Sequence, residues 1–241
     1  CLRVPRVPTG YRGRKLFARL RAGTDRRRDP RKVDLAMREY YIYNVPFFVV
    51  NEVQEDVSIP HLCADIEEFI SPELLRNVDV FYLGDFEELK GRNAAYADGA
   101  IYISSAELTN EDIMENVMHE IAHSLEESFS SHIYDSDLVS EFRAKRETLR
   151  EILKSHGYKL SPEYYDNLQY NRKFDSFLAD TVGYPELLSL TMGLFASPYG
   201  ATSIQEYFAN GFEKYFLDSP EALRKISPVL YRKIEEILDA S

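Results

Sequence analysis

The sequence predicts an α+β fold with a mostly helical C-terminal half. The segments with β-type patterns all end by Ile103, and segments with helical periodicity follow one another after that point. The 241 residues are 44% hydrophobic and 29% charged, which is ordinary for a globular protein whose core is large enough to bury a site. This composition excludes a disordered or collagen-like chain.

The predicted strands are short and rich in aromatic and β-branched residues. They cover residues 40–43, 47–50, 78–83 and 100–103. Pro46 separates the first two strands, and the turn signal Asp98-Gly99 leads into the last one. Between the second and third strands, apolar spacing predicts a helix over 60–70, and Ser71-Pro72-Glu73 predicts the start of a short helix.

The best-defined element is a helix over 110–127. Thr109 and Asp112 have the spacing of a capping box, and acidic residues in the first turn suit the positive end of the helix dipole. Ile113, Val117 and Ile121 then recur at every fourth position. Further helices are predicted over 137–156, from Ser161, over 203–217 and after Ser219.

Charge is distributed unevenly along the chain. Residues 1–33 form a basic N-terminal arm in which twelve Lys and Arg stand against Asp25 and Asp29, whereas the rest has a net charge of −21. Such an arm suits contact with nucleic acid or an acidic protein surface. A solvated tail, or one folded against the acidic body, is favoured because no aromatic or base-reading motif accompanies the charge. Residues 34–241 are predicted to form one domain.

The sequence was also searched for membrane spans, a signal segment and cysteine motifs. No stretch approaches the ~18 apolar residues of a membrane span. The first residues contain neither an apolar signal core nor an initiator Met, so we expect a fragment or a processed product. Cys1 and Cys63 are too few for a disulfide framework and too far apart for a thiolate metal site.

The chemistry of the chain is concentrated in His119-Glu120-Ile121-Ala122-His123, a complete H-E-x-x-H motif. Two imidazoles four residues apart lie on one face of a helix, so both can bind one ion. Zinc takes neutral imidazole nitrogens, lowers the pKa of bound water towards ~7 and polarises a carbonyl. Glu120 is the candidate general base, and the alternative is a chance spacing of two surface histidines.

The third zinc ligand is less certain from the sequence. Glu126 and Phe129 stand where an extended H-E-x-x-H-x-x-G-x-x-H site needs Gly and His, which excludes that class. His132 is expected in a loop, and His61 and His156 are expected to be structural or at the surface. Glu206, in the helix from Ser203, is the better candidate. It could instead close a capping box with Ser203, unless Thr202 and Gln205 form that box.

The two islands His119-Glu120-x-x-His123 and Tyr199-x6-Glu206-Tyr-Phe-Ala resemble the lethal-factor-like zinc metallopeptidases. These gluzincin-type zincins include the catalytic domain of anthrax lethal factor and the clostridial Pro-Pro endopeptidases. The resemblance implies a zincin-like metallopeptidase fold over 34–241, with a small mixed sheet, an active-site helix and an edge strand that receives substrate.

The resemblance also implies roles for individual residues. His119, His123 and Glu206 would bind Zn²⁺, Glu120 would be the general base and Tyr199 would donate to the oxyanion. Asn210 stands where an acidic residue beside a ligand is common. The strand Ile101-Tyr102-Ile103 directly precedes the active-site helix and is expected to be the edge that receives an extended peptide.

The leading functional hypothesis is a zinc-dependent endopeptidase that acts on a protein or peptide substrate. The alternative is a structural or assembly component, for example of a phage particle or toxin, that retains a zincin fold. Every predicted catalytic position carries a suitable residue type, which favours activity.

Overall fold

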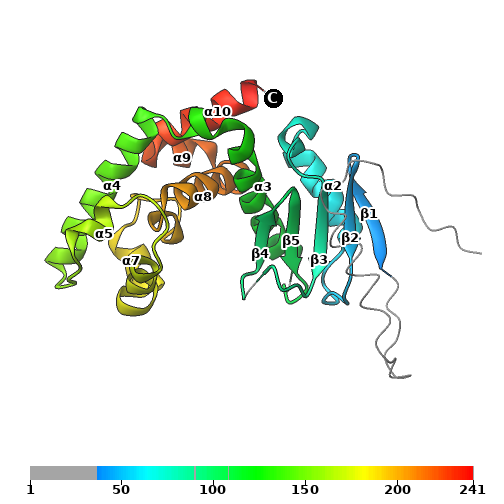
Figure 1. Ribbon diagram of the computed structural model, residues 1–241, viewed down its shortest axis with the longest axis horizontal. Helices are drawn as coiled ribbons and strands as arrows, with labels where there is room; N and C mark the ends of the chain where they lie inside the picture. Colours follow the sequence, from blue (N-terminus) through cyan, green and yellow to red (C-terminus); the bar gives the residue numbers. More distant parts are fainter. Residues whose placement is uncertain (1–36, 90, 108, 241) are drawn as a thin grey trace, which may run out of the picture. The chain divides into compact units, whose positions relative to one another are not determined.

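The computed structural model describes residues 37–89, 91–107 and 109–240 (Figure 1). The predicted basic arm, residues 1–33, lies outside the described residues. The chain divides into two compact units, one up to Ser124 and one from Leu125. The prediction of one metallopeptidase domain over 34–241 stays a prediction.

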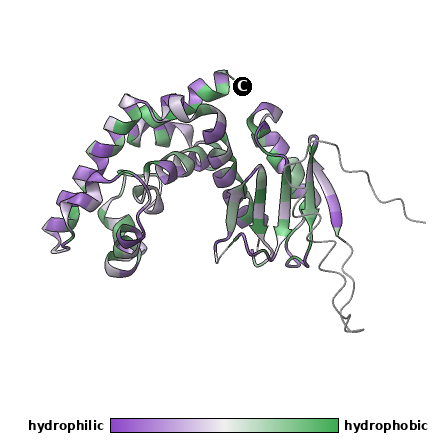
Figure 2. Ribbon diagram, viewed as in Figure 1, coloured by the Kyte–Doolittle hydropathy of each residue, from purple (hydrophilic) through white to green (hydrophobic). Residues whose placement is uncertain are grey.

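The first unit contains a five-stranded mixed sheet, so the predicted mixture of helices and strands is confirmed. Its strands are β1 (Arg38–Ile42), β2 (Val45–Val49), β3 (Val80–Gly84), β4 (Ala94–Ala97) and β5 (Ala100–Ser104), in the order β1-β2-β3-β5-β4. The pairs β2–β3 and β3–β5 are parallel, whereas β1 and β4 pair antiparallel at the two edges. The inner strands are largely hydrophobic and β1 is more hydrophilic (Figure 2).

The β4–β5 hairpin corrects one expectation of the sequence analysis. Ile101 of β5 pairs with Phe81 on one side and with Tyr96 on the other. The strand containing Ile101, Tyr102 and Ile103 is therefore not an edge, and that part of the prediction is wrong. The edge is β4, which joins β5 through Asp98 and Gly99, both with positive φ (50° and 79°), as a type I′ turn requires.

Aromatic residues stack along both faces of the sheet. On one face the rings of Phe47 and Phe81 stack at 5.7 Å. On the other, Tyr82 stacks between Phe48 and Tyr102 at 5.8 and 5.5 Å. Successive side chains of a strand point to opposite faces of the sheet. Both faces of the inner strands are apolar, and this explains why their sequences are continuous hydrophobic runs.

The helices of this unit are α2 (Ile59–Phe69), the 3₁₀ turn η2 (Pro72–Leu75) and the first part of α3 (Asn110–Ile133). These confirm the helices predicted over 60–70, from Pro72 and from 110, although α3 runs six residues beyond its predicted end. The capping box is confirmed: the Asp112 N–H donates to Thr109 Oγ1 at 3.1 Å, and the Thr109 N–H donates to Asp112 Oδ2 at 3.0 Å.

The second unit is helical. After the end of α3 it contains α4 (Ser136–Ser155), α5 (Pro162–Asp166), α6 (Arg172–Ser176), the π-helical turn η3 (Phe177–Val182), α7 (Tyr184–Leu190), the 3₁₀ turn η4 (Tyr199–Ala201), α8 (Ile204–Leu217), α9 (Pro220–Ile226) and α10 (Pro228–Asp239). The single last helix expected after Ser219 is two helices, because Ser227 and Pro228 interrupt it.

Helices α4, α8 and α10 form the core of the second unit (Figure 1). Phe142 of α4 packs against Tyr207 of α8 with ring centroids 5.0 Å apart. Glu141 accepts hydrogen bonds from the Tyr207 hydroxyl at 2.9 Å and from the Val229 N–H at 2.8 Å, so one carboxylate joins all three helices. A Cβ on Gly211 would lie 2.3 Å from Leu230 Cδ2, which confirms that this glycine permits a close approach between helices.

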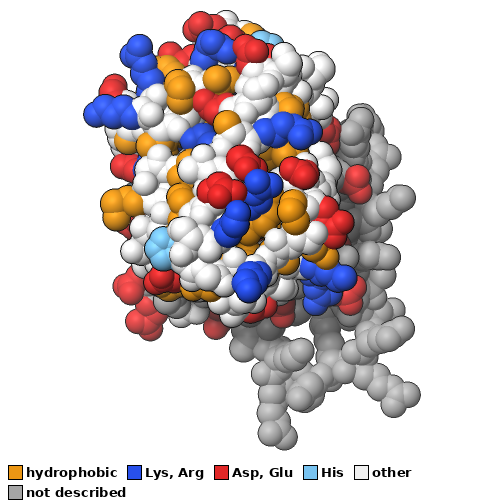
Figure 3. Space-filling view, turned by 90° about the vertical axis from the view of Figure 1, so that its left-hand side faces the viewer, with side chains coloured by type: hydrophobic (Ala, Val, Ile, Leu, Met, Phe, Trp, Pro, Cys, Tyr) orange, Lys and Arg blue, Asp and Glu red, His pale blue; other side chains and the backbone are white. Residues whose placement is uncertain are grey.

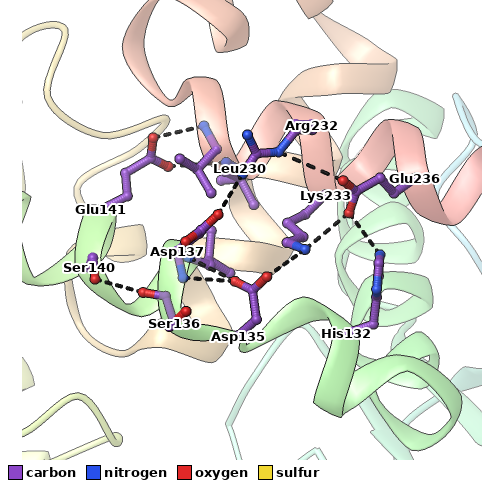
Figure 4. Close-up of polar contacts among 12 residues, drawn as sticks. His132, Asp135, Ser136, Asp137, Ser140, Glu141, Leu230, Arg232, Lys233 and Glu236 are labelled. Carbon is purple, nitrogen blue, oxygen red and sulfur yellow. Dashed lines mark hydrogen bonds and ion pairs between the residues drawn. The ribbon is translucent and has the colours of Figure 1, made fainter.

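A group of charged residues fixes α10 to the start of α4 (Figure 4). Lys233 of α10, almost fully buried, pairs with Asp135 at 2.7 Å and with Glu236 at 3.0 Å. Glu236 also contacts His132 at 2.9 Å, and Arg232 pairs with Asp137 at 3.0 Å. We call these six residues the Lys233 network.

The surface in Figure 3 carries basic and acidic side chains interspersed with hydrophobic ones. No helix in the described part of the chain is long and apolar enough to cross a membrane.

Candidate metal centre

Helix α3 is held in the first unit at three levels along its length. Near its start, Asn110 exchanges hydrogen bonds with the backbone of Ser58, which precedes α2 (2.9 and 3.1 Å). At the last residue of the unit, the Asn77 side chain donates to the Ser124 carbonyl at 2.8 Å. Between these points, the Tyr96 N–H of β4 donates to Glu120 Oε2 at 2.6 Å. The H-E-x-x-H segment therefore lies on a helix fixed on both sides of the motif.

His119 and His123 face one another on α3. Their Nε2 atoms lie 3.2 Å apart, with the rings nearly perpendicular at 73°. Two imidazole nitrogens that bind one tetrahedral zinc at ~2.05 Å lie about 3.3 Å from each other. The separation thus fits a shared ion, and without one it also permits a hydrogen bond between a donor and an acceptor tautomer.

Glu120 is 8% exposed and points towards the edge of the sheet. In the antiparallel β4–β5 pair, N–H groups alternate between facing the partner strand and facing away from it. The Tyr96 N–H faces away from β5, because it donates to the Glu120 carboxylate. This hydrogen bond fixes the position of the predicted general base relative to the outer edge of β4.

Glu206 lies in the first turn of α8. Ser203 is the N-cap, and its Oγ accepts a hydrogen bond from the Glu206 N–H at 3.1 Å. The alternative capping box is not formed, since Thr202 Oγ1 donates to the Tyr199 carbonyl and the Gln205 side chain contacts Gln169. A carboxylate in this turn is stabilised by the positive end of the helix dipole.

The structure groups three potential ligands. One donor atom from each of His119, His123 and Glu206 lies within 4.8 Å of the other two. Two imidazoles and one carboxylate are a donor set that zinc accepts, with a fourth position left for a water molecule or substrate. Among the described residues, His61, His132 and His156 join no such group. His132 lies in the last turn of α3 rather than in the expected loop.

Tyr134, directly after α3, lies near Glu206 within the second unit. Its ring packs against Phe208 of α8 at 6.3 Å, and its hydroxyl is buried without a hydrogen-bond partner in the part of the chain that the structure describes. Burial, followed by the carboxylates of Glu126 and Glu206, raises the pKa of Tyr134. The hydroxyl therefore stays protonated and can donate to a nearby carboxylate. No sequence pattern pointed to this residue.

Tyr199 begins the 3₁₀ turn η4, which leads into α8. Asn210 holds this turn: its side-chain oxygen accepts a hydrogen bond from Ser197 Oγ, and its amide donates to the Glu206 carbonyl at 2.8 Å. Asn210 is therefore tied to the Tyr199 turn and to the backbone of Glu206, and a direct role beside a ligand histidine stays a prediction.

The buried guanidinium of Arg146 holds the same 3₁₀ turn, η4, through hydrogen bonds to backbone carbonyls. Arg146 of α4 is 1% exposed and donates to the carbonyls of Ala201 at 2.7 Å and Tyr164 at 2.6 Å. It also donates to the carbonyls of Thr202 and Asn167 at 3.3 and 3.1 Å, and it lies 4.0 Å above the centre of the Phe174 ring. Burial lowers the pKa of Arg146 to about 10, so the group stays charged at neutral pH.

Sequence reasoning missed Arg146 because α4 carries many charged residues. Nothing in the spacing of those residues distinguishes the one that is buried from the exposed ones.

Comparisons of the chain with protein-family models, curated proteins and solved structures find no match. The functional assignment therefore depends on the residues described above.

Proposed function

We propose that the chain is a zinc-dependent endopeptidase with a zincin-like fold, similar to the lethal-factor-like metallopeptidases. The observation that carries the proposal is the group His119, His123 and Glu206, in which the two imidazole Nε2 atoms have the separation that a shared zinc ion requires. The resemblance of the Tyr199–Glu206 segment adds support.

In this proposal His119, His123 and Glu206 hold the zinc. When bound, zinc would supply Lewis-acid polarisation of the scissile carbonyl and lower the pKa of the attacking water. Glu120 takes the proton of that water on its carboxylate and passes it to the leaving amine. The hydrogen bond from the Tyr96 N–H orients the Glu120 carboxylate for this role.

Tyr199 provides the second donor for the oxyanion through its hydroxyl. The contacts of Arg146 and Asn210 hold its backbone in place, so little reorganisation is needed when the negative charge develops. The substrate peptide extends along the outer edge of β4 rather than along β5, because β5 has partners on both sides.

The test combines metal analysis with peptide hydrolysis. We expect one zinc per chain by elemental analysis, and cleavage of a peptide library that a chelator abolishes and added zinc restores. His123→Ala should lose the metal, and Glu206→Ala should bind it much more weakly. His132→Ala is the matched control, because His132 belongs to the Lys233 network, and it should keep full zinc content.

Two outcomes would contradict the proposal. Full metal affinity in Glu206→Ala would move the third ligand elsewhere, with Glu126 and Glu127 as the next residues to replace. Stoichiometric zinc without hydrolysis of diverse peptide libraries would support the structural or assembly role instead.

A further inference from the structure

A carboxylate bound by two tyrosines lies in the helical second unit. Asp175 of α6 accepts a hydrogen bond from the Tyr170 hydroxyl on Oδ2 at 2.7 Å. It accepts another from the Tyr184 hydroxyl on Oδ1 at 3.0 Å. The three residues come from the loop before α6, from α6 itself and from the start of α7. The arrangement therefore depends on how this part of the chain folds and not on one element alone.

The cluster lies beside the first turn of α8, which carries the predicted ligand Glu206. The Leu168 carbonyl accepts a hydrogen bond from the Ile204 N–H at 2.9 Å, and Gln169 contacts Gln205 at 3.1 Å. Residues 168–170 thus run along the first turn of α8, the turn that carries Glu206.

Tyr184 is held by the same carboxylate. Burial and Asp175 are the main causes that raise the pKa of Tyr184.

The negative charge of Asp175 has no cationic partner in the described part of the chain. Its side-chain contacts are the two phenol hydroxyls, although Arg172 and Lys173 precede it on the same helix with exposed side chains. Each carboxylate oxygen accepts one phenol hydroxyl and keeps a further lone pair. A carboxylate with a lone pair remaining on each oxygen can accept two N–H groups of a guanidinium, and aromatic rings also attract cations.

We propose that Asp175, Tyr170 and Tyr184 form a subsite for a basic side chain, Arg or Lys, of the substrate peptide. This inference rests on the endopeptidase function proposed above. The two hydroxyls hold the carboxylate in place, and the basic residue supplies the charge that Asp175 lacks. Leu168 and Gln169, which precede Tyr170, contact the first turn of α8, so the subsite lies beside the turn that carries the proposed ligand Glu206.

The first test measures binding without catalysis. Protein labelled with 3-fluorotyrosine is titrated with acetyl-arginine amide, acetyl-lysine amide and acetyl-citrulline amide. The resonances of Tyr170 and Tyr184 are assigned from the Tyr170→Phe and Tyr184→Phe variants. We expect both resonances to shift with the arginine or lysine probe and to stay unchanged with citrulline, which has nearly the same shape without the charge.

Asp175→Asn keeps the shape of the side chain and should weaken binding of the cationic probes at least about tenfold, the equivalent of losing one modest charge pair. Glu186→Gln is the matched control, because Glu186 is an exposed carboxylate of the neighbouring helix α7. It should bind as the unaltered protein does. Circular dichroism and melting temperature check that both variants are folded.

The second test measures selectivity in the zinc-loaded protein. A cleaved peptide library should show Arg or Lys enriched at one position near the scissile bond. Asp175→Asn should lower kcat/KM about tenfold for those peptides and leave peptides with a neutral residue there unchanged. Asp175→Lys should shift the preference towards Asp or Glu.

The two tests separate the subsite from the endopeptidase function. Probe binding that depends on Asp175, without hydrolysis of any peptide, supports the cation subsite and contradicts the endopeptidase function. Hydrolysis without a basic preference, together with unchanged tyrosine resonances, overturns the subsite and leaves the endopeptidase function standing. Equal binding of the arginine probe by Asp175→Asn also overturns the subsite.

Discussion

The backbone N–H of Tyr96 donates a hydrogen bond to Glu120 Oε2 at 2.6 Å. The donor belongs to the edge strand β4, and the acceptor belongs to the H-E-x-x-H segment of α3. The contact therefore sets the distance between the edge of the sheet, where we place the substrate, and the group that we expect to move the proton. Every residue except proline carries this backbone donor, so any other exchange at position 96 leaves it available to orient the carboxylate.

The first prediction concerns Glu120→Gln. The amide oxygen of Gln can still accept from the Tyr96 N–H, so the fold and the zinc content should not change. The amide cannot take a proton from water, so turnover should fall by ~10²–10⁴. Peptide hydrolysis and elemental analysis on the same preparation check this. Turnover within a few fold of the unaltered protein would exclude Glu120 as the general base.

The second prediction concerns Tyr199→Phe. The exchange keeps the ring and removes only the hydroxyl, and Arg146 and Asn210 continue to hold the turn through contacts that do not involve the ring. Zinc content and melting temperature should therefore be unchanged, whereas turnover should fall by ~10²–10³ for the loss of one oxyanion donor. Tyr158→Phe, on the loop after α4, is the control and should have full activity. If both variants have full activity, Tyr199 is a packing residue and the resemblance is weakened.

The third prediction concerns Gly211→Ala in α8. The new methyl group would lie within 2.3 Å of Leu230 Cδ2 and 2.9 Å of Leu230 Cγ. Overpacking of this kind costs ~1–3 kcal/mol, and the higher helix propensity of Ala offsets about 1 kcal/mol. We expect the free energy of unfolding, measured with urea, to fall by up to about 2 kcal/mol.

A double-mutant cycle shows whether the loss comes from this contact. Leu230→Ala should cost less in the Gly211→Ala protein than in the unaltered one, because it also relieves the overlap. A Gly211→Ala variant more stable than the unaltered protein would show that α8 and α10 can move apart at no cost.

The fourth prediction concerns the pH dependence of stability. Hydrogen bonding to Lys233 lowers the pKa of Asp135 below its usual 3.8 and that of Glu236 below its usual 4.5. Carboxylates with lowered pKa values stabilise the fold above those usual values, and this contribution is lost as the pH falls through the lowered values. Lys233→Met should therefore flatten the dependence of the unfolding free energy on pH between about pH 5 and pH 2.

Lys154→Met is the matched control, because Lys154 is exposed and its ion pair with Glu151 is long, at 3.9 Å. It should leave the acid dependence unchanged. An equally steep acid dependence in Lys233→Met would mean that other carboxylates dominate it.

The sequence was sufficient to predict elements that carry strong local signals. The start of α3 follows from the reciprocal capping of Thr109 and Asp112, and the β5 hairpin follows from Asp98-Gly99. Both depend only on neighbouring residues, so a single sequence contains the necessary information.

Other elements depend on contacts that sequence patterns do not reveal. Strand β4 reads Ala94-Ala95-Tyr96-Ala97, with small residues of low β propensity, and it is a strand because it pairs with β5. Missing β4 also made β5 appear to be the edge. In the second unit the α-helix α6, the π-helical turn η3 and the α-helix α7 follow one another closely. A search for apolar residues with a period of 3.6 does not predict where one type of helix ends and the next begins.

The candidate site also contains residues that the sequence predicts and residues that only the structure reveals. Spacing alone put His119, Glu120 and His123 on one helix. The search for a third ligand favoured Glu206, and the resemblance supported that choice and supplied Tyr199. The supporting contacts of Tyr96, Arg146 and Asp175 come from residues distant in sequence, and the chemistry of each residue type is too common for the sequence to single it out.

Within the described residues, the hydrogen-bond acceptors of Arg146 are main-chain oxygens, those of Tyr164, Asn167, Ala201 and Thr202. A carbonyl is present whatever amino acid occupies a position, so the side chains of these loops can change while the hydrogen bonds to Arg146 remain. Insertions and deletions are different, because they would move these four oxygens out of reach of the guanidinium. In variants selected for a new peptide specificity, we therefore expect changes of residue type in 164–171 and 197–202 at constant loop length. Grafted loops of another length should require a simultaneous change at position 146.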